Sequence, residues 1–288
     1  MVAGYGRVSL VRADDGVLLP ATARSRKVLP LCGDRVLLAS QGTAECVIEA
    51  IAPRTSIFER ANGYRRKPIA ANATQLVVLA ACEPSFSDEL ICRMLVAAEG
   101  AGLAALIVLN KVDLTALRGA AMEQLDPFRR SGYRIVELSG KADAGPLRPY
   151  LQGHRSLFAG QSGMGKSTLL KTLVPDAEVR IREISHYLNA GRQSTTAARL
   201  HTLDESSELI DSPGLSEFGL GGAGAREIAA GFREFAPHSA NCRFQDCRHL
   251  DEPDCGIREA TARGEIHPRR LALYQRIVRL EQAAKTAP

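Results

Sequence analysis

A nine-residue stretch in the middle of this 288-residue chain decides the fold. It reads GQSGMGKST and comprises Gly160, Gln161, Ser162, Gly163, Met164, Gly165, Lys166, Ser167 and Thr168. It satisfies the pattern G-x-x-x-x-G-K-[ST], with the apolar residues SLFA before it and the helix-forming residues STLLKTLV overlapping its end. Glycines allow backbone N–H groups to point into one concavity, and the following helix adds the positive end of its dipole. The stretch therefore predicts a phosphate-binding loop between a strand and a helix.

The side chains at the end of this loop predict how phosphates would be held. Lys166 is expected to reach the β- and γ-phosphates of a nucleotide. Ser167 is expected to ligate Mg²⁺, and Thr168 lies at the edge of the same turn.

A second motif, NKVD, comes earlier in the chain and consists of Asn110, Lys111, Val112 and Asp113. It follows the apolar run AALIVL, so its side chains should emerge at the carboxyl edge of a sheet, where open α/β sheets bind ligands. Asp113 would accept two hydrogen bonds from guanine, Asn110 would tie this loop to the phosphate loop, and Lys111 would lie over the base. The two motifs together indicate GTP, although their order is the reverse of the usual one.

A third motif follows the phosphate loop. In ELIDSPG, Asp211 ends an apolar stretch, and Gly214 stands three residues later. We expect Asp211 to hold the Mg²⁺ shell through water and the Gly214 N–H to sense the γ-phosphate.

Two further segments offer candidate ligands. In GRQSTTAARLH, either Thr195 or Thr196 would bind Mg²⁺ and the γ-phosphate, and the sequence does not choose between them. In ELSGK, Ser139 follows an expected strand. It is either part of a base-supporting loop or an ordinary turn residue.

Four residues near the C-terminus form the pattern C-x4-C-x-H-x5-C: Cys242, Cys247, His249 and Cys255. Three thiolates and one imidazole make a closed tetrahedral shell for zinc and leave no open position for catalysis. The pattern therefore predicts one structural zinc ion.

The hydrophobic patterning predicts a multidomain α/β protein in three parts. Short strands separated by Gly and Asp favour an OB-fold β-barrel over residues 1–62, with a polar, basic linker at 54–75. Apolar strands alternating with amphipathic helices predict a parallel sheet within a nucleotide-binding domain at 70–225. Residues 226–288 are expected to form a helical zinc-binding module.

The excess of basic over acidic residues lies at the two ends of the chain, and residues 226–288 contain 11 Lys and Arg against 9 Asp and Glu. Residues 1–70 contain 11 Lys and Arg against 6 Asp and Glu, and the whole chain has a formal net charge of +5. The charge is equally compatible with a nucleic-acid partner and with a solvated surface. The N-terminus has no signal-peptide pattern, and the apolar runs are too short to cross a bilayer. We therefore expect a cytoplasmic protein, with no membrane partner.

The motifs in this order resemble one family closely, the circularly permuted GTPases named ribosome small-subunit-dependent GTPase A. The resemblance also rests on GDRV, IEAIAPRTSIFER, AANATQ and GRQSTTAARL, and it covers nearly the whole chain. It implies a GTP hydrolase with ribosome-stimulated activity that acts late in maturation of the small (30S) ribosomal subunit. It also implies that the barrel and the zinc module contact ribosomal RNA, and that hydrolysis releases the protein.

The resemblance bears on catalysis at two positions. Leu215 occupies the place where many GTPases carry a water-orienting glutamine, so slow unaided hydrolysis is expected. Many family members have a histidine at the position of Gln193, and we expect Gln193 to orient the attacking water in its place.

Two other functions stay open at this point. One is an RNA-binding scaffold that senses GTP and GDP without needing turnover. The other is a permuted GTPase of large-subunit assembly, which would share the motif order. A monomer is the default oligomeric state.

Overall fold

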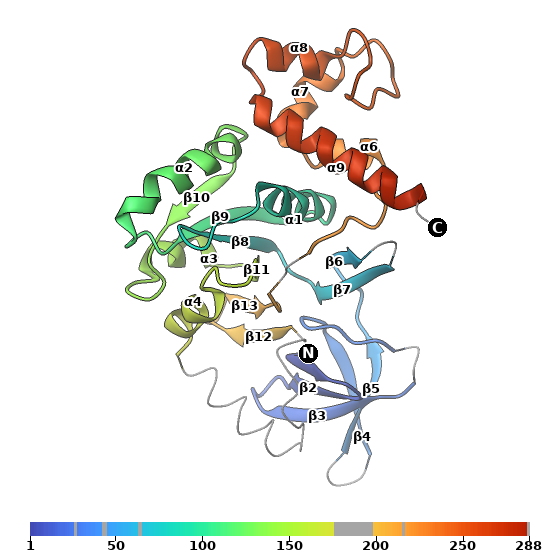
Figure 1. Cartoon of the computed structure of the whole chain (residues 1–288). Coiled ribbons are helices and arrows are strands. Elements are labelled where there is room, and N and C mark those ends of the chain that lie inside the picture. Colours follow the sequence, from blue (N-terminus) through green and yellow to red (C-terminus); the bar gives the residue numbers. More distant parts are fainter. Residues whose placement is uncertain (26–27, 42–44, 63–64, 176–197, 215–216, 287–288) are drawn as a thin grey trace.

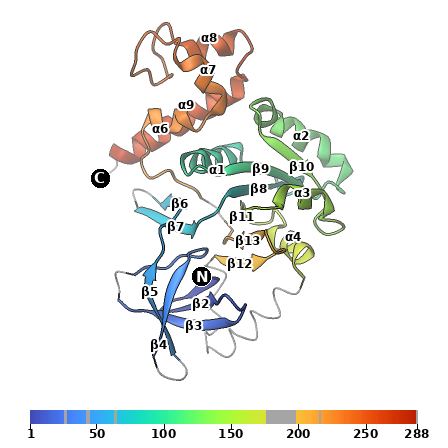
Figure 2. The same cartoon turned by 180° about the vertical axis from the view of Figure 1, so that it is seen from behind.

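The computed structural model describes residues 1–25, 28–41, 45–62, 65–175, 198–214 and 217–286 (Figure 1). Figures 1 and 2 show three bodies in sequence: a β unit at the N-terminus, a central α/β unit, and a group of helices at the C-terminus. The mixed α/β architecture predicted from the sequence is confirmed.

The N-terminal unit is built from five short strands. They are β1 (Ala3–Tyr5), β2 (Val8–Arg12), β3 (Leu18–Ala23), β4 (Val36–Gln41) and β5 (Glu45–Ile51). Their order in the sheet is β1-β2-β3-β5-β4, and only the β3–β5 pair is parallel. This non-sequential order is the Greek-key arrangement expected of an OB-fold.

The central unit contains six strands of the same sheet. They are β8 (Gln75–Ala81), β9 (Ala104–Asn110), β10 (Arg134–Glu137), β11 (Arg155–Gly160), β12 (Arg199–Thr202) and β13 (Glu208–Asp211). The run β10-β9-β8-β11-β13 is parallel throughout. Every residue of β8 is buried, as expected for a parallel strand with both faces covered.

Helices cover both faces of these strands. They are α1 (Asp88–Gly100), α2 (Thr115–Arg130), the 3₁₀ turn η1 (Gly145–Leu147), α3 (Arg148–Leu151) and α4 (Lys166–Leu173). Figure 1 shows α1 and α2 on one side of the sheet and α3 and α4 on the other. The start of α1 is fixed by the Ser87 hydroxyl, which accepts a hydrogen bond from Leu90 N at 3.2 Å.

The N-terminal and central units share one continuous sheet. Strand β12 pairs antiparallel with β1, with Ala3 opposite Arg199. Glu208 on β13 strengthens this junction because its carboxylate forms ion pairs with both Arg12 and Arg155. The eleven-stranded sheet therefore joins two units that the sequence predicts as separate domains.

The prediction of a linker at residues 54–75 is wrong. The segment forms a two-stranded antiparallel hairpin, β6 (Ile57–Asn62) and β7 (Arg65–Ala71). Its base is packed into the core, since Phe58, Ala70 and Ala71 are fully buried.

The C-terminal unit is helical, as predicted. It contains α6 (Ala225–Ala230), the 3₁₀ turn η2 (Arg233–Phe235), α7 (Ala236–Ser239), α8 (Gly256–Ala262) and α9 (Pro268–Thr286). Arg270 of α9 is fully buried, forms an ion pair with Glu234 at 2.6 Å, and lies over the Phe128 ring of α2. None of the helices in the described ranges is long and apolar enough to cross a membrane.

Candidate functional site

The phosphate loop connects the end of β11 to the start of α4. Gly163 and Gly165 both have φ of 84°, a conformation that residues with a Cβ rarely adopt. A Cβ on Gly165 would also lie 2.4 Å from Asn110 Nδ2. Ser167 and Thr168 are exposed in the first turn of α4. The loop and helix therefore present backbone N–H groups at a helix N-terminus, as anion binding requires.

Asn110 joins the NKVD loop to the phosphate loop. Its side-chain amide is buried and donates to the Met164 carbonyl at 2.9 Å, while its oxygen accepts from Lys111 N and Gly140 N, both at 2.8 Å. Lys111 reaches in the same direction, and its ammonium donates to the Gly163 carbonyl at 2.8 Å. These contacts span 52 to 54 residues of sequence and bring the two motifs together.

Asp113 and Ser139 meet on the exposed side of the NKVD loop. A hydrogen bond from Ser139 is the main cause that holds the pKa of the Asp113 carboxylate below its usual value. Val112 connects the two loops through the backbone, because its N–H donates to the Leu138 carbonyl at 3.3 Å. The base-supporting role of Ser139 stays a prediction, and its hydrogen bond to Asp113 is compatible with that role.

Lys166 and Asp211 meet at the other end of the phosphate loop. The Lys166 ammonium forms an ion pair with the Asp211 carboxylate. Gly214 lies close by, since a Cβ at this residue would be 3.8 Å from Ser162 Cα. The Ser212 hydroxyl fixes the segment between them by donating to the Phe158 carbonyl of β11 at 2.6 Å.

One contact that positions the phosphate loop was not predicted from the sequence. The Gln161 side-chain oxygen accepts a hydrogen bond from Ser87 N at 2.7 Å, so it contacts the start of α1. A Cβ on Gly163 would lie 3.1 Å from Pro84 Cγ in the same segment. Gln161 therefore positions the loop with its side chain. The pattern gives no signal of this, because the position is a free x in G-x-x-x-x-G-K-[ST].

Four residues of the sequence predictions lie outside the described residues. They are Gln193, Thr195, Thr196 and Leu215.

The four predicted metal ligands form one cluster in the C-terminal unit. The ligand atoms of Cys242, Cys247, His249 and Cys255 all lie within 4.8 Å of one another. His249 Nδ1 is 3.5 Å from Cys242 Sγ and 3.4 Å from Cys255 Sγ, and these two sulfurs are 4.0 Å apart. Tetrahedral zinc with thiolate and imidazole ligands places neighbouring ligand atoms about 3.5–3.8 Å apart. The cluster thus has the composition and spacing to hold a metal ion.

Side chains of helix α9 form hydrogen bonds with the backbone of the metal cluster. The Tyr274 hydroxyl donates to the Arg248 carbonyl at 2.7 Å, and Gln275 Nε2 donates to the His249 carbonyl at 3.1 Å. The rings of Phe235 and His249 meet edge to face at 5.9 Å. These contacts fix the backbone of a ligand residue, as is usual around metal sites.

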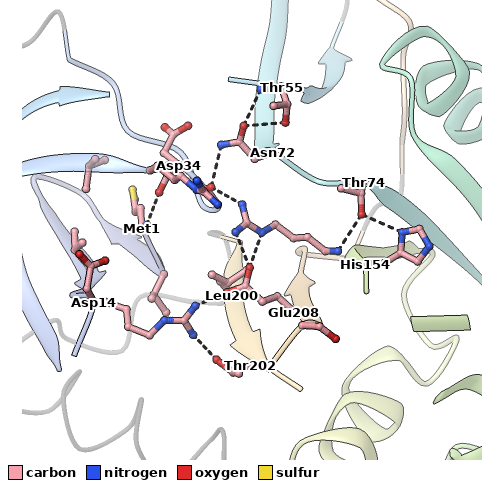
Figure 3. A pocket seen from close by; sticks show the side chains of 18 of the residues that line it. Met1, Asp14, Asp34, Thr55, Asn72, Thr74, His154, Leu200, Thr202 and Glu208 are labelled. Carbon is pink, nitrogen blue, oxygen red and sulfur yellow. Dashed lines mark hydrogen bonds and ion pairs between the residues drawn. The ribbon is translucent and has the colours of Figure 1, made fainter. Parts of the chain in front are cut away.

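A large open cavity lies away from both sites. It has a volume of about 1170 Å³ and lies where the N-terminal strands meet β12 and β13 (Figure 3). Charged side chains line it, including Arg12, Asp34, Arg155 and Glu208. None of its lining residues belongs to the phosphate loop or to NKVD. The cavity is therefore a feature of the junction between the two units.

Comparison with known proteins agrees with this arrangement of motifs. The model of the RsgA GTPase family matches residues 51–221. The small ribosomal subunit biogenesis GTPase RsgA of Nitrosospira multiformis is 44% identical over 96% of this chain and 89% of its own length. The protein of the same name from Bordetella pertussis is 45% identical over 99% and 96%.

Two solved structures share the fold. YjeQ from Thermotoga maritima superposes with a TM-score of 0.75 at 28% identity, covering 100% of this chain and 98% of that one. YloQ, described as a circularly permuted GTPase, gives 0.73 at 25% identity, covering 100% and 95%. The reversed order of NKVD and the phosphate loop is therefore a circular permutation, and this chain belongs to the RsgA GTPase family.

Proposed function

We propose that this protein is a cytoplasmic GTP hydrolase of small-ribosomal-subunit biogenesis. It binds the subunit in its GTP state, hydrolyses GTP when the subunit stimulates it, and is then released. The names of relatives that share about 45% identity over nearly the whole chain support this assignment. The observation that carries it is the Asn110–Met164 hydrogen bond, because it unites the base-reading and phosphate-binding motifs despite their permuted order.

In this proposal the nucleotide lies along the carboxyl edge of the parallel strands. Asp113, held by Ser139, reads guanine through two hydrogen bonds from its ring edge. Phosphates lie on the backbone of 160–168, with Lys166 at the β- and γ-phosphates. Bound Mg²⁺ would neutralise the charge that develops on the phosphates, and Ser167 and Asp211 are the residues that would hold it.

Lys166 and Asp211 lie close enough to form an ion pair, so both side chains can act on one bound nucleotide. Lys166 would contact the phosphates, and Asp211 would serve the Mg²⁺ shell. Gly214, which lies next to the phosphate loop, would sense the γ-phosphate through its N–H.

Three residues outside the described ranges complete the catalytic proposal. Gln193 orients the attacking water, and Thr195 or Thr196 contacts Mg²⁺ and the γ-phosphate. The expected result is that Gln193→Ala lowers subunit-stimulated turnover at least tenfold, whereas Gln193→His retains it. Unchanged turnover of Gln193→Ala would remove Gln193 from the mechanism.

The metal cluster is proposed to hold one structural zinc ion. Three sulfurs and one imidazole suit zinc, and the four ligands leave no position open for water. We divide the chain into an RNA-binding OB-fold domain (1–62), a permuted GTPase domain (70–225) and a zinc-binding domain (226–288), acting as a monomer. Ribosomal RNA is the partner proposed for the two end domains.

Phosphate release tests the proposed activity. GTP turnover is measured with the chain alone, with purified small subunits and with purified large subunits, and Lys166→Ala serves as the inactive control. We expect stimulation of at least tenfold by small subunits. A GTP-sensing scaffold would bind nucleotide without this stimulation, and a large-subunit factor would respond to large subunits instead.

A further inference from the structure

Helix α1 begins with a cap that its own residues leave incomplete. The Ser87 hydroxyl accepts a hydrogen bond from Leu90 N at 3.2 Å. In a complete capping box, a Glu or Gln three residues after the cap would accept a hydrogen bond from the N–H of the cap residue in return. Leu90 holds that position, and it is buried and has no side-chain acceptor. The N–H of Ser87 therefore needs an acceptor from elsewhere in the chain.

Gln161 of the phosphate loop supplies this acceptor. Its Oε1 accepts a hydrogen bond from Ser87 N at 2.7 Å, across 74 residues of sequence. Both residues are half-buried, where a backbone N–H without a partner costs free energy. Gln161 thus completes the capping box of α1 from another segment, and it joins the start of this helix to the phosphate loop.

A second contact joins the same two segments. A Cβ on Gly163 would lie 3.1 Å from Pro84 Cγ and 3.3 Å from Pro84 Cδ, so the loop passes close to the residues just before the cap. Gly163 follows Gln161 by two residues, and Pro84 precedes Ser87 by three. A shift in the start of α1 would therefore act on the loop at two points.

The first turn of α1 is also bound to α9. Asp88 forms an ion pair with Arg269, and Glu89 forms one with Arg276 at 2.8 Å. The carboxylate side chains of Asp88 and Glu89 are only 14% and 21% exposed, so both are largely covered. Helix α9 therefore holds the turn that carries the cap.

Buried contacts farther along α1 also hold the two helices together. Arg93 of α1 forms an ion pair with Glu281 of α9, and both residues are buried. Arg270 of α9 donates from its guanidinium to Cys92 Sγ of α1 at 3.3 Å. Separation of a buried ion pair leaves uncompensated charges, so a displacement of α9 from α1 costs free energy. The position of α1 is thus tied to that of α9.

We propose that Gln161 is a positioning residue for the phosphate loop and that α9, through the first turn of α1, sets how tightly the loop holds GDP. The inference rests on the proposed function, because it concerns the site that would bind GTP and GDP. Backbone N–H groups of the loop would hold the phosphates, so their orientation decides the strength of binding. A shift of α9 away from Asp88 and Glu89 would loosen the cap, release the loop and speed the loss of GDP.

Substitution of Gln161 tests its contact with Ser87. Gln161→Met keeps the side-chain length and removes the acceptor, whereas Gln161→Glu keeps both. The dissociation rate of a fluorescent GDP from the full chain is measured in about 0.5 M salt, which screens the charge that Gln161→Glu adds. We expect Gln161→Met to raise the rate at least about fivefold, as the loss of one hydrogen bond predicts, and Gln161→Glu to stay within about twofold of the wild type. Equal rates in the two variants would overturn the role of Gln161.

Ser87→Ala separates this contact from the stability of the helix. It removes the hydroxyl that caps α1 and leaves the N–H that contacts Gln161. Loss of a serine cap destabilises a helix, so we expect a lower unfolding temperature but a GDP dissociation rate within about twofold of the wild type. If Ser87→Ala speeds the loss of GDP as much as Gln161→Met does, the contact acts only through the stability of α1 and the proposal is wrong.

Charge removal on α9 tests the second half of the proposal. Arg269→Gln/Arg276→Gln removes both ion pairs with the first turn of α1. The matched control is Arg263→Gln/Arg279→Gln, because the ion pairs of these two arginines stay within the C-terminal unit. In roughly 0.05 M salt, we expect the first variant to raise the GDP dissociation rate about three- to tenfold, since partly exposed ion pairs contribute modestly, and the control to change it less than about twofold. Equal rates in the two double variants would overturn the control by α9.

Combination of the variants tests whether they act along one route. If α9 acts through Gln161, Arg269→Gln/Arg276→Gln should add nothing to the effect of Gln161→Met, because residues that act through one contact are not additive. Effects that multiply would show that α9 acts elsewhere and would overturn the coupling. A wild-type chain that binds no GDP would instead contradict the proposed function, whatever the variants do.

Discussion

Asn110 and Met164 are joined by a hydrogen bond of 2.9 Å between the side-chain amide and the backbone carbonyl, although 54 residues separate them. The contact links the loop that reads the base to the loop that holds the phosphates. It is independent of the order in which the two loops occur along the chain. The permuted sequence therefore preserves the nucleotide site, because each motif still lies at the carboxyl edge of its strand.

Removal of this amide should weaken nucleotide binding. Asn110→Ala leaves the buried Met164 carbonyl and Gly140 N–H without the partner each has now. Unsatisfied buried groups cost about 1–3 kcal/mol each, so we expect GDP affinity to fall about 10- to 100-fold. Titration with a fluorescent guanine nucleotide measures it. Affinity within twofold of the wild type would show that the contact does not position the site.

Asp113→Asn should change which base is bound. Guanine offers two donors to a carboxylate, whereas xanthine offers one donor and one acceptor, which match an amide. We expect GTP affinity to fall at least 100-fold and xanthosine triphosphate to bind better than GTP. Competition between the two nucleotides measures this preference. A variant that still prefers GTP would place base recognition at another residue.

Metal removal should destabilise the C-terminal unit. We expect about one zinc per chain, and a strong chelator should lower the unfolding temperature because the ligands hold α8 and the loop before it against α9. Cys247→Ser should reproduce this effect, whereas Cys46→Ser, outside the cluster, should retain the zinc. Elemental analysis and thermal unfolding are the measurements. Full zinc content in Cys247→Ser would exclude this ligand set.

Acid should weaken the junction between the N-terminal and central units. Burial alone would raise the pKa of Glu208, but Arg155 and Arg12 outweigh it and lower the pKa below its unfolded value of 4.5. A lowered pKa means that the contribution to stability is present above about pH 4.5 and is lost as pH falls through the folded-state value. Thermal unfolding between pH 3 and pH 7 should therefore show a weaker acid dependence in Glu208→Gln. The exposed neighbour Glu205→Gln should behave like the wild type. Equal acid dependence in all three proteins would contradict the assignment.

The sequence predicted the central sheet well, because buried parallel strands are continuous apolar runs. The residues of β8 and β9 are an example, and the helix between them, α1, is the one expected from the sequence that follows β8. The metal cluster could also be predicted from the sequence, because cysteine and histidine at this spacing are typical of metal sites. Both features depend on residues close together in the chain.

The hairpin and the continuous sheet were not predictable in the same way. Strand β7 begins Arg65-Arg66-Lys67-Pro68, a run typical of a polar linker. Its partner strand β6 contacts Phe218 and Gly219, which lie far along the chain. Strand β12 has only four residues, and its contact with β1 rests on a single register pair. Local sequence patterns carry little information about contacts between residues that are far apart in the chain.

Sedimentation with purified ribosomal subunits tests the central claim most directly. The chain is mixed with small or large subunits in the presence of GDP or a non-hydrolysable GTP analogue, and the fraction that sediments with each subunit is measured. We predict co-sedimentation with the small subunit in the GTP-analogue state and release in the GDP state. Preference for the large subunit, or equal binding in both nucleotide states, would contradict the account.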